Sequence, residues 1–543
     1  MLTLRVNNQT VDLGDDISIS WELRSPMFYE MGSRSYPFRI KNTPYNQKIF
    51  GYRHRIEGFN DVYSEFPCEI AFKGIDMFRG TLKFRVLNSQ YYECTVYNRE
   101  GDFFYKSKGV TLRQINFGEI FSANNYYAQV YINNCKGKFY PERNVAFPVI
   151  YNPYYFDPPT TDNEQEYFNY HQANGTVTEF TTGFNRTVIV PMVYFRHVLE
   201  TVLSYLGYRV YDDVFASNSE FNKLVIFNSL SCNSQCDDFA YTMQHMYLNL
   251  HLPNITVNEF ITTVEAYFNC RFLVNDIERA IHIVPLCGLV NNANSIDFSS
   301  AVTSKSIEMD EPTTGLKLTI AIDSSDEHMK LWTENQDVYL KYLCPPVDAL
   351  ADLPAWPYAM VRDVRFVSSL NKYYQFTLAK TWVESADVKA ALLSNYFIGD
   401  SSKNLDLKLS ALKNGYPGSP GWQSSCGNTK ADWKDIMFKM FFVKMISSNE
   451  STFTISSDTS TSMYLWFNGT NNVYDKFHKD WISFLFSTKA VKVFRQMSLS
   501  DIRGLDFSKK ILIDSNKFFI RRLQVTLKKN EIMTSALECL TVK

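Results

Sequence analysis

Residues Thr256–Pro285 show the clearest pattern of apolar and polar positions in the chain. Thr256 and Glu259 are spaced as a capping box, in which each side chain satisfies a backbone N–H at the start of a helix. From Phe260 onward apolar residues recur with helical spacing, and the period then changes to two on either side of a polar turn at 275–279. The pattern predicts a capped amphipathic helix followed by a β-hairpin, an arrangement typical of a scaffold.

A second helix and strand are predicted earlier in the chain. Apolar side chains at 195–206 lie on one helical face, and Gly207 follows them as a C-cap. A strand is expected to begin at Tyr208. The two units share this order of elements, but their sequences differ too much to form a repeat.

Alternation with a period of two predicts that most other elements are strands. The predicted strands cover residues 2–6, 17–21, 68–72, 77–86, 91–97, 316–322, 361–366, 373–378, 511–513 and 518–520. Turns are expected at 7–8 and 514–516, a buried strand at 432–446 and a helix at 473–485. Consecutive antiparallel strands favour a small barrel or sandwich.

The predicted fold class is α+β and β-dominated, and a chain of 543 residues is too long for one core. We expect two small antiparallel β-barrel-like domains, helix-containing insertions and a β-rich C-terminal region. The expected ranges are 1–120 for the first β-barrel-like domain, 121–255 for a long aromatic arm with a helix–strand unit, 256–310 for the capped helix and hairpin, 311–400 for the second β-barrel-like domain, and 401–543 for the C-terminal region.

The segment FPVIYNPYYFDPPTTDNEQEYFNYHQANG predicts a long loop or extended arm, because it is rich in Pro, Asn and Tyr and lacks periodicity. Its exposed rings would form an apolar patch, which favours ordering against a neighbouring subunit. A partner interface is therefore predicted at Tyr151, Tyr154, Tyr155 and Phe156. An internal Ω-loop packed on its own domain explains the same composition, and both interpretations stay open.

The charge and hydropathy of the chain argue against a nucleic-acid-binding protein and against a membrane-spanning one. Lys plus Arg number 55 and Asp plus Glu number 57, so a net charge of −2 predicts no electrostatic footprint for nucleic acid. No aromatic–basic stripe that would bind single-stranded nucleic acid is evident. No apolar run approaches the ~20 residues that span a bilayer, and the N-terminal residues do not resemble a signal peptide. We expect synthesis in a cytoplasm and no membrane-spanning segment.

The motifs of common enzymes are absent from the sequence, which contains no GxSxG, HExxH, Walker A or GxGxxG pattern. Cys232 and Cys236 are spaced as a zinc half-site but lack further ligands at zinc-finger spacing, so no metal site is predicted. Asp162, Glu164 and Glu166 form an acidic cluster in the arm, which we interpret as a solvated loop. We therefore predict that the chain is not an enzyme and that it binds no cofactor.

Several stretches resemble baseplate hub and tail-tip proteins of tailed bacteriophages. NITVNEFITTVEAYFNCRFLVNDIERAIHIVP is similar to their helix-plus-hairpin unit, and CEIAFKGIDMFRGTLKF is similar to their first barrel. The stretch YDKFHKDWISFLFSTKAVKVFRQMSLSDIRGLDFSKKILIDSNKFFIRRLQVTL resembles the C-terminal end of large tail proteins from phages and prophages of Bacteroidetes-type bacteria, and SYPFRIKNTPYNQKIFGYRHRIEG fits the same group. Together these stretches are spread along the chain from residue 35 to residue 527.

The resemblance implies a homotrimer in which each chain contributes two similar barrels. Such a ring would present six barrels to the hexameric tail tube and a threefold face to spike or fibre proteins. DNA would pass through the lumen without specific binding, and the protein would reside in the virion tail after assembly in the bacterial host cytoplasm. The tail type and the neighbouring proteins are not implied.

Two other function classes are compatible with the sequence. A tail protein that binds host glycans could stack sugar faces on the tyrosines of the arm. A carbohydrate-active enzyme would need paired carboxylates, for which Glu164 and Glu166 are the candidates.

Overall fold

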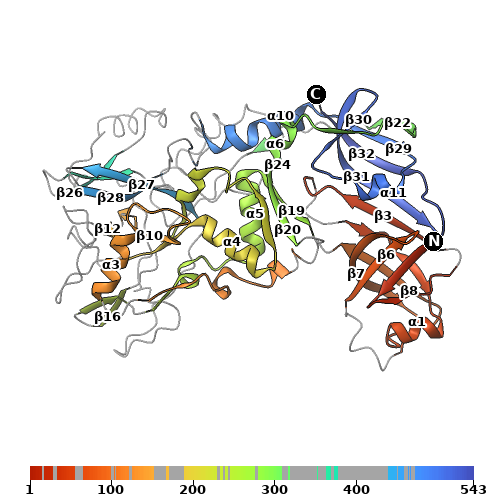
Figure 1. The fold of residues 1–543 in the computed structure, drawn as a ribbon, viewed down its shortest axis with the longest axis horizontal. Helices are drawn as coiled ribbons and strands as arrows, with labels where there is room; N and C mark the ends of the chain where they lie inside the picture. Colours follow the sequence, from red (N-terminus) through yellow and green to blue (C-terminus); the bar gives the residue numbers. More distant parts are fainter. Residues whose placement is uncertain are drawn as a thin grey trace. The chain divides into compact units, whose positions relative to one another are not determined.

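The structure is a computed structural model, viewed as a ribbon in Figure 1. It describes residues 1–14, 17–28, 33–55, 65–98, 103, 106–121, 125–148, 150–151, 167–169, 189–228, 233–236, 239–242, 245–275, 279–308, 316–317, 351–352, 363–367, 372–376, 438–448, 451–457, 463, 465 and 471–542. The chain divides into two compact units, each assembled from separate ranges. Unit 1 comprises Met1–Lys106, Arg271–Thr313 and Lys479–Lys543, and unit 2 comprises Ser107–Cys270 and Thr314–His478.

Unit 1 is built around a large β-sheet. Its strands are β1 (Leu2–Val6), β2 (Gln9–Thr10), β3 (Ser18–Arg24), β4 (Arg34–Ser35), β5 (Phe38–Lys41), β6 (Phe66–Phe72), β7 (Ile75–Leu87), β8 (Tyr91–Asn98), β21 (Ser295–Asp297), β22 (Val302–Glu308), β29 (Ala490–Arg495), β30 (Lys510–Ile513), β31 (Asn516–Lys528) and β32 (Ser535–Val542). Its helices are α1 (Pro44–Ile49), α6 (Leu286–Asn291), α10 (Lys479–Ser487) and α11 (Leu499–Arg503). The hairpin strands β19 (Cys270–Asn275) and β20 (Ala280–Pro285) pair with each other.

The 14 strands of this sheet are hydrogen-bonded along an open path, β2-β1-β6-β7-β8-β4-β3-β31-β32-β29-β22, with β5, β21 and β30 beside it. The predicted strands near both termini are therefore present. The prediction of closed barrels is corrected, because the path of the described strands has two ends, at β2 and β22. Alternation determines which face of a strand is buried, but it does not determine whether a sheet closes.

The first and last parts of the chain join in the middle of this sheet. Strand β3 pairs antiparallel with β31, from Ser18 opposite Lys528 to Arg24 opposite Arg522. The N-terminal strands are therefore completed by strands from the other end of the sequence. For example, the hydroxyls of Ser20 and Thr526 lie 2.9 Å apart, although the two residues are 506 positions apart in the sequence.

The apolar faces of these strands form one core. Alternate residues of β1 are buried, as the sequence pattern predicts. Leu4, Ile70 and Leu82 from the N-terminal strands are fully buried in the same cluster as Leu523 and Leu537 from the C-terminal strands. The sheet thus has a single core to which both ends of the chain contribute.

Two tight turns appear where they are predicted. Asn7 and Asn8 both have positive φ, of 49° and 63°, and Asp514 and Ser515 have φ of 47° and 67°. Two consecutive left-handed residues are the mark of a type I′ turn, whose twist suits a two-residue hairpin. Asn and Asp tolerate this conformation better than most residues.

Unit 2 contains more helix and shorter strands. Its helices are α3 (Asn125–Cys135), α4 (Phe195–Tyr205) and α5 (Val257–Phe268), with short 3₁₀ segments η2 (Leu112–Gln114), η3 (Ser219–Lys223) and η4 (Leu248–His251) and the π-helix η6 (Tyr474–His478). Its strands are β9 (Glu119–Phe121), β10 (Val145–Ala146), β11 (Ile150–Tyr151), β12 (Tyr167–Phe168), β13 (Met192–Val193), β14 (Arg209–Asp213), β15 (Leu224–Ile226), β16 (Asn233–Cys236), β17 (Phe239–Thr242), β18 (His245–Tyr247), β23 (Leu316–Lys317), β24 (Ala351–Asp352), β25 (Asp363–Val367), β26 (Lys372–Phe376), β27 (Met440–Ser448) and β28 (Ser451–Ser457).

An aromatic cluster connects several helices of unit 2. The ring of Phe215 packs edge-on against Phe195 at 5.1 Å, Phe221 at 4.8 Å and Phe268 at 5.1 Å. Phe477 lies 5.7 Å from Phe268. Edge-to-face rings add stabilisation beyond the area they bury, so this cluster ties α4, η3, α5 and η6 together.

The range 311–400, predicted as a second β-barrel-like domain, lies largely outside the described residues. Its described parts are two short pairs, β23 with β24 and β25 with β26. The second pair is the hairpin predicted from the alternation at 361–378. The buried strand predicted at 432–446 is present from Met440, where β27 pairs with β15 and β28. The five consecutive domain ranges stay a prediction.

Candidate functional site

The capping box predicted at the start of α5 is present. The Thr256 hydroxyl accepts a hydrogen bond from the Glu259 backbone N–H at 3.1 Å, and the Glu259 carboxylate accepts one from the Thr256 backbone N–H at 2.7 Å. One turn along, Phe260 is fully buried, 6.1 Å from the ring of Phe195 and 5.6 Å from that of Phe438. These residues position α5 in the core of unit 2.

Gly207 ends helix α4 in a Schellman motif. Its N–H donates to the Ser204 carbonyl at 2.9 Å, and the Tyr208 N–H donates to the Leu203 carbonyl at 3.0 Å. Gly207 has a φ of +85°, which favours glycine because a Cβ would clash in the left-handed region. The helix–glycine–strand order predicted from the sequence is therefore the observed one.

The aromatic arm is described only at its ends. Tyr151 lies in β11, where it pairs with Tyr167 of β12. Tyr154, Tyr155 and Phe156 lie outside the described residues, and so does the acidic cluster at 162–166. Their predicted partner interface is untested by the described contacts.

Asn169 holds the two ends of this arm on unit 2. Its buried side chain donates to the carbonyls of Pro148 and Val190, each at 2.9 Å, and accepts from the Val190 N–H at 2.9 Å. With φ at 52°, Asn169 occupies the left-handed region that Asn tolerates best among residues with a Cβ. Asn169 therefore joins the end of β12 to the backbone at Pro148 and Val190.

Helix α4 carries a polar cluster that joins it to two other described segments of unit 2. The Tyr140 hydroxyl donates to one oxygen of the Glu200 carboxylate at 2.6 Å. Arg196 donates to the other oxygen at 2.7 Å and also to the Asn222 side chain at 2.7 Å. Its guanidinium lies 5.2 Å from the centre of the Tyr140 ring. The i, i+4 spacing of Arg196 and Glu200 is the sequence signal that could have indicated this cluster.

The electrostatics of the cluster disfavour a nucleophilic tyrosine. Burial and, after it, the hydrogen bond to the Glu200 carboxylate raise the pKa of Tyr140 well above its ordinary value, so the phenol stays protonated and donates. Burial likewise raises the pKa of Asp213, against the effect of the Phe215 N–H, which donates to its carboxylate at 2.8 Å. The cluster is suited to holding the Tyr140 segment on α4 and η3.

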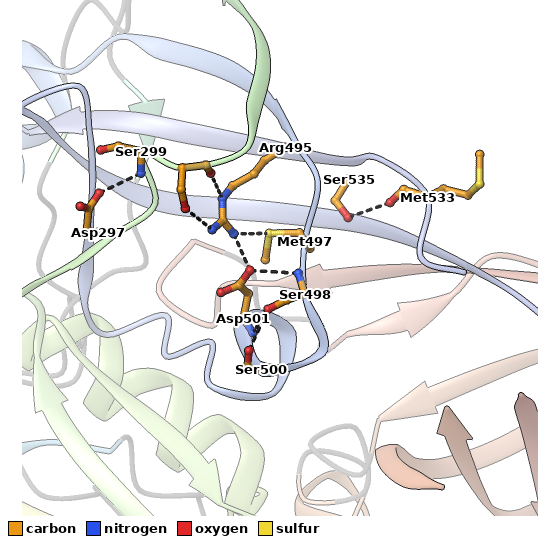
Figure 2. A network of polar contacts seen from close by, with 10 residues as sticks. Asp297, Ser299, Arg495, Met497, Ser498, Ser500, Asp501, Met533 and Ser535 are labelled. Carbon is orange, nitrogen blue, oxygen red and sulfur yellow. Dashed lines mark hydrogen bonds and ion pairs between the residues drawn. The ribbon is translucent and has the colours of Figure 1, made fainter. Parts of the chain in front are cut away.

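In unit 1, a buried arginine organises the end of β29 (Figure 2). Arg495, only 4% exposed, donates to the Ser300 carbonyl and to the Asp501 carboxylate, both at 2.8 Å, and to the Met497 sulfur at 3.1 Å. Its guanidinium carbon lies 4.4 Å from the centre of the Phe298 ring. A buried charge requires such partners, and here they fasten the segment before β22 to β29 and α11.

The carboxylate that pairs with Arg495 also caps a helix. Asp501 accepts from the Ser498 backbone N–H at 2.9 Å, while its own N–H donates to the Ser498 hydroxyl at 3.1 Å. Burial acts to raise the pKa of Asp501, but the bonds from Ser498 and Arg495 outweigh it and hold the pKa below its ordinary value. No pattern in the sequence singled out this network.

Within the described ranges, no group of three or more His, Cys, Asp or Glu side chains could hold a metal ion. Cys232 lies outside those ranges, and only the backbone of Cys236 is described, in β16. Among the helices that the structure describes, none is long and apolar enough to cross a membrane.

No protein-family profile and no curated protein matches the chain. Among solved structures, it aligns with the 43 kDa tail protein of prophage MuSo2 from Shewanella oneidensis at 7% identity and a TM-score of 0.33, over 99% of this chain and 96% of that one. It also aligns with the tail protein from Neisseria meningitidis MC58 at 8% identity and a TM-score of 0.28, over 99% and 95%. At these values the alignments establish neither a shared fold nor a shared function.

Proposed function

We propose that the chain is a structural protein of a bacteriophage tail and, more specifically, a homotrimeric tail hub or tail-tip protein. Its place would be the virion tail, between the hexameric tube and the threefold spike or fibre assembly, with DNA passing through the lumen. The protein would perform no covalent chemistry and need no cofactor. Assembly would take place in the cytoplasm of the bacterial host.

One observation carries the proposal. Two of the stretches that resemble hub proteins, CEIAFKGIDMFRGTLKF and the C-terminal stretch, form β6–β7 and β29–β31, and a third contributes β5. Although these stretches lie at opposite ends of the sequence, their strands belong to the same sheet of unit 1. Three of the four stretches therefore contribute strands to one sheet, and the helix-plus-hairpin stretch forms α5, β19 and β20 outside it.

The chemistry of the described polar clusters agrees with a structural role. Glu200 and Asp501 are each held by an arginine and by further hydrogen bonds within the protein. Groups satisfied in this way specify the positions of loops and strands, whereas a catalytic group must reach a substrate. Glycan binding by Tyr154 and Tyr155 stays the alternative, and none of the described contacts favours it.

Native mass spectrometry of the purified full chain tests the homotrimer. We expect a species of three chains, each of 63.0 kDa, that persists on dilution. A single chain at every concentration would contradict the homotrimer and leave the tail assignment to be tested by position in the particle.

A further inference from the structure

Residues 33–55 of unit 1 have an unusual charge for this chain. The segment SRSYPFRIKNTPYNQKIFGYRHR contains six Lys and Arg residues and no Asp or Glu, namely Arg34, Arg39, Lys41, Lys48, Arg53 and Arg55. Since the whole chain has a net charge of −2, the rest of it is acidic. Cations gathered in this way on one segment form a local positive surface despite the near-neutral total.

The local fold exposes four of these six cations. In β5, Phe38 and Ile40 are buried, while the alternating Arg39 and Lys41 are exposed. Helix α1 and the turn after it follow directly, and they expose Lys48 and Arg55. The period of two in β5 and the short helix thus place charge on the solvent side and apolar groups in the core.

A rigid base supports this surface. The Phe50 ring is fully buried, 5.1 Å from Phe84 and 5.2 Å from Tyr92. The buried Asn46 side chain donates to the carbonyls of Asp12 at 2.8 Å and Lys41 at 2.9 Å, and it accepts from the Asp12 N–H at 3.0 Å. A surface held in this way loses little conformational freedom when a partner binds.

Tyrosine rings lie among the cations. Tyr36, Tyr45 and Tyr52 are 37%, 55% and 42% exposed, and the Arg55 guanidinium lies 4.8 Å from the centre of the Tyr52 ring. We call this set the basic tyrosine surface, defined as Tyr36, Arg39, Lys41, Tyr45, Lys48, Tyr52 and Arg55. Tyr45 and Lys48 lie in α1, which is labelled in Figure 1, and the other five residues flank it in the sequence. Tyrosine and arginine are the residues that most often carry binding energy at protein interfaces.

The occupant that fits this surface is acidic and aromatic. Within it, Arg39 already binds a carboxylate, Glu93, at 3.3 Å while stacking 4.4 Å above the Tyr91 ring. In this contact a carboxylate pairs with a guanidinium that also packs on a tyrosine ring, which is the kind of contact expected with a partner. Carboxylates of a protein partner would repeat it at Lys41, Lys48 and Arg55.

We propose that the basic tyrosine surface binds a second copy of this chain through the acidic aromatic segment at residues 150–169. That segment contains four acidic residues and no Lys or Arg, with its acids at Asp157, Asp162, Glu164 and Glu166. Its aromatic residues include Tyr154 and Tyr155, and Pro158 and Pro159 follow them. Acids complement the cations, and proline-rich segments bind to exposed aromatic rings. The inference rests on the homotrimer of the proposed function and specifies which residues of two neighbouring copies are in contact.

A labelled peptide of residues 150–169 tests the contact by fluorescence anisotropy on the full chain. We expect binding that weakens as salt is added, because exposed charges are screened. Replacing Lys41, Lys48 and Arg55 with Ala should weaken binding roughly tenfold, since several exposed ion pairs are lost together. The matched control replaces Lys489, Arg503 and Lys528, which are exposed cations elsewhere in unit 1, and should change binding less than about twofold.

The peptide itself supplies a second control. A version with Asn or Gln at its four acidic positions should bind as weakly as the native peptide binds the triple variant. Thermal unfolding of each chain variant should match that of the wild type, which separates lost binding from lost folding. Equal binding of the native peptide by the wild type and the triple variant would overturn the proposal. Binding of an oligonucleotide of thymidines by the wild-type chain, together with no binding of the native peptide, would also overturn it.

The oligomeric state separates the two hypotheses. The contact is supported if the wild type is a homotrimer, the triple variant is not, and the native peptide dissociates the wild-type homotrimer. A homotrimer that persists unchanged in the triple variant overturns the contact and leaves the homotrimer standing. A wild-type chain that is monomeric at all concentrations overturns both.

Discussion

At the scale of single residues, buried polar groups fix the positions of loops and strands. Arg495, Asn169 and Asn46 each make several hydrogen bonds to backbone carbonyls or carboxylates. Leaving such a group without partners costs the full desolvation of that group, so each one favours a single arrangement of its neighbours. The sequence alone did not indicate any of the three, because each has at least one partner more than 20 residues away in the sequence.

His478 predicts a pH dependence. Its ring is 3% exposed, and its Nε2 lies 2.9 Å from the Tyr267 carbonyl. Burial lowers the pKa of His478 to about 4, below the ordinary value of 6.5. The unfolded chain therefore binds the proton more readily between these values, and stability falls as the pH drops from 6.5 to 4. The loss expected from this residue is roughly 3 kcal/mol.

Hydrogen exchange in urea, followed in peptides that cover α5, measures this loss for unit 2. His478→Gln, which keeps a hydrogen-bond donor without the titration, should show a smaller loss between pH 6.5 and 4 than the wild type. At pH 7 the variant is expected to be no more than moderately destabilised, because a neutral donor is retained. Equal pH slopes in the two proteins would show that His478 is not the titrating group.

At the scale of elements, the sequence predicted local structure well. The hairpin turns, the cap of α5 and the end of α4 depend on residues close together in the sequence, such as Thr256 with Glu259 and Gly207 with Ser204. These are the interactions that propensity and spacing describe. In the polar cluster, spacing could have indicated the pair of Arg196 and Glu200, but it could not indicate the contact of Tyr140, which lies 60 residues from Glu200.

The capping box supplies an element-scale prediction. Thr256→Ala removes the acceptor of the Glu259 N–H and should lower the free energy of unfolding of unit 2 by about 1 kcal/mol. Thr262→Ala is the matched control, because Thr262 lies inside α5 and bonds the Asn258 carbonyl instead of capping a helix end. That control should be neutral or slightly stabilising, as alanine favours helix interiors. Hydrogen exchange in peptides from the first turn of α5 compares the two, and equal effects would contradict the capping role.

At the scale of the whole molecule, the sequence predicted many strands and did not predict how they join. Alternation in 17–21 and 518–520 marks two strands, yet nothing in either range indicates that β3 pairs with β31. For the same reason a barrel-like domain was expected at 1–120, whereas the described strands of this range share one open sheet with strands from the C-terminal end. Pairings between distant segments are set by complementary surfaces in three dimensions.

This shared sheet gives the proposed function its structural basis. Three of the four stretches that resemble tail hubs lie far apart in the chain and contribute strands to this sheet. The basic tyrosine surface lies in the same unit and offers a contact through which copies could associate. A structural subunit of a tail needs such contacts, since it acts by binding its neighbours.

Electron microscopy of the full chain co-expressed with a tail tube protein tests the central claim most directly. The account predicts extra density of threefold symmetry at one end of the tube, which disappears when the chain is omitted. Tubes that form normally with the chain free in solution, or bound at random along their length, would contradict the assignment as a tail hub or tail-tip protein.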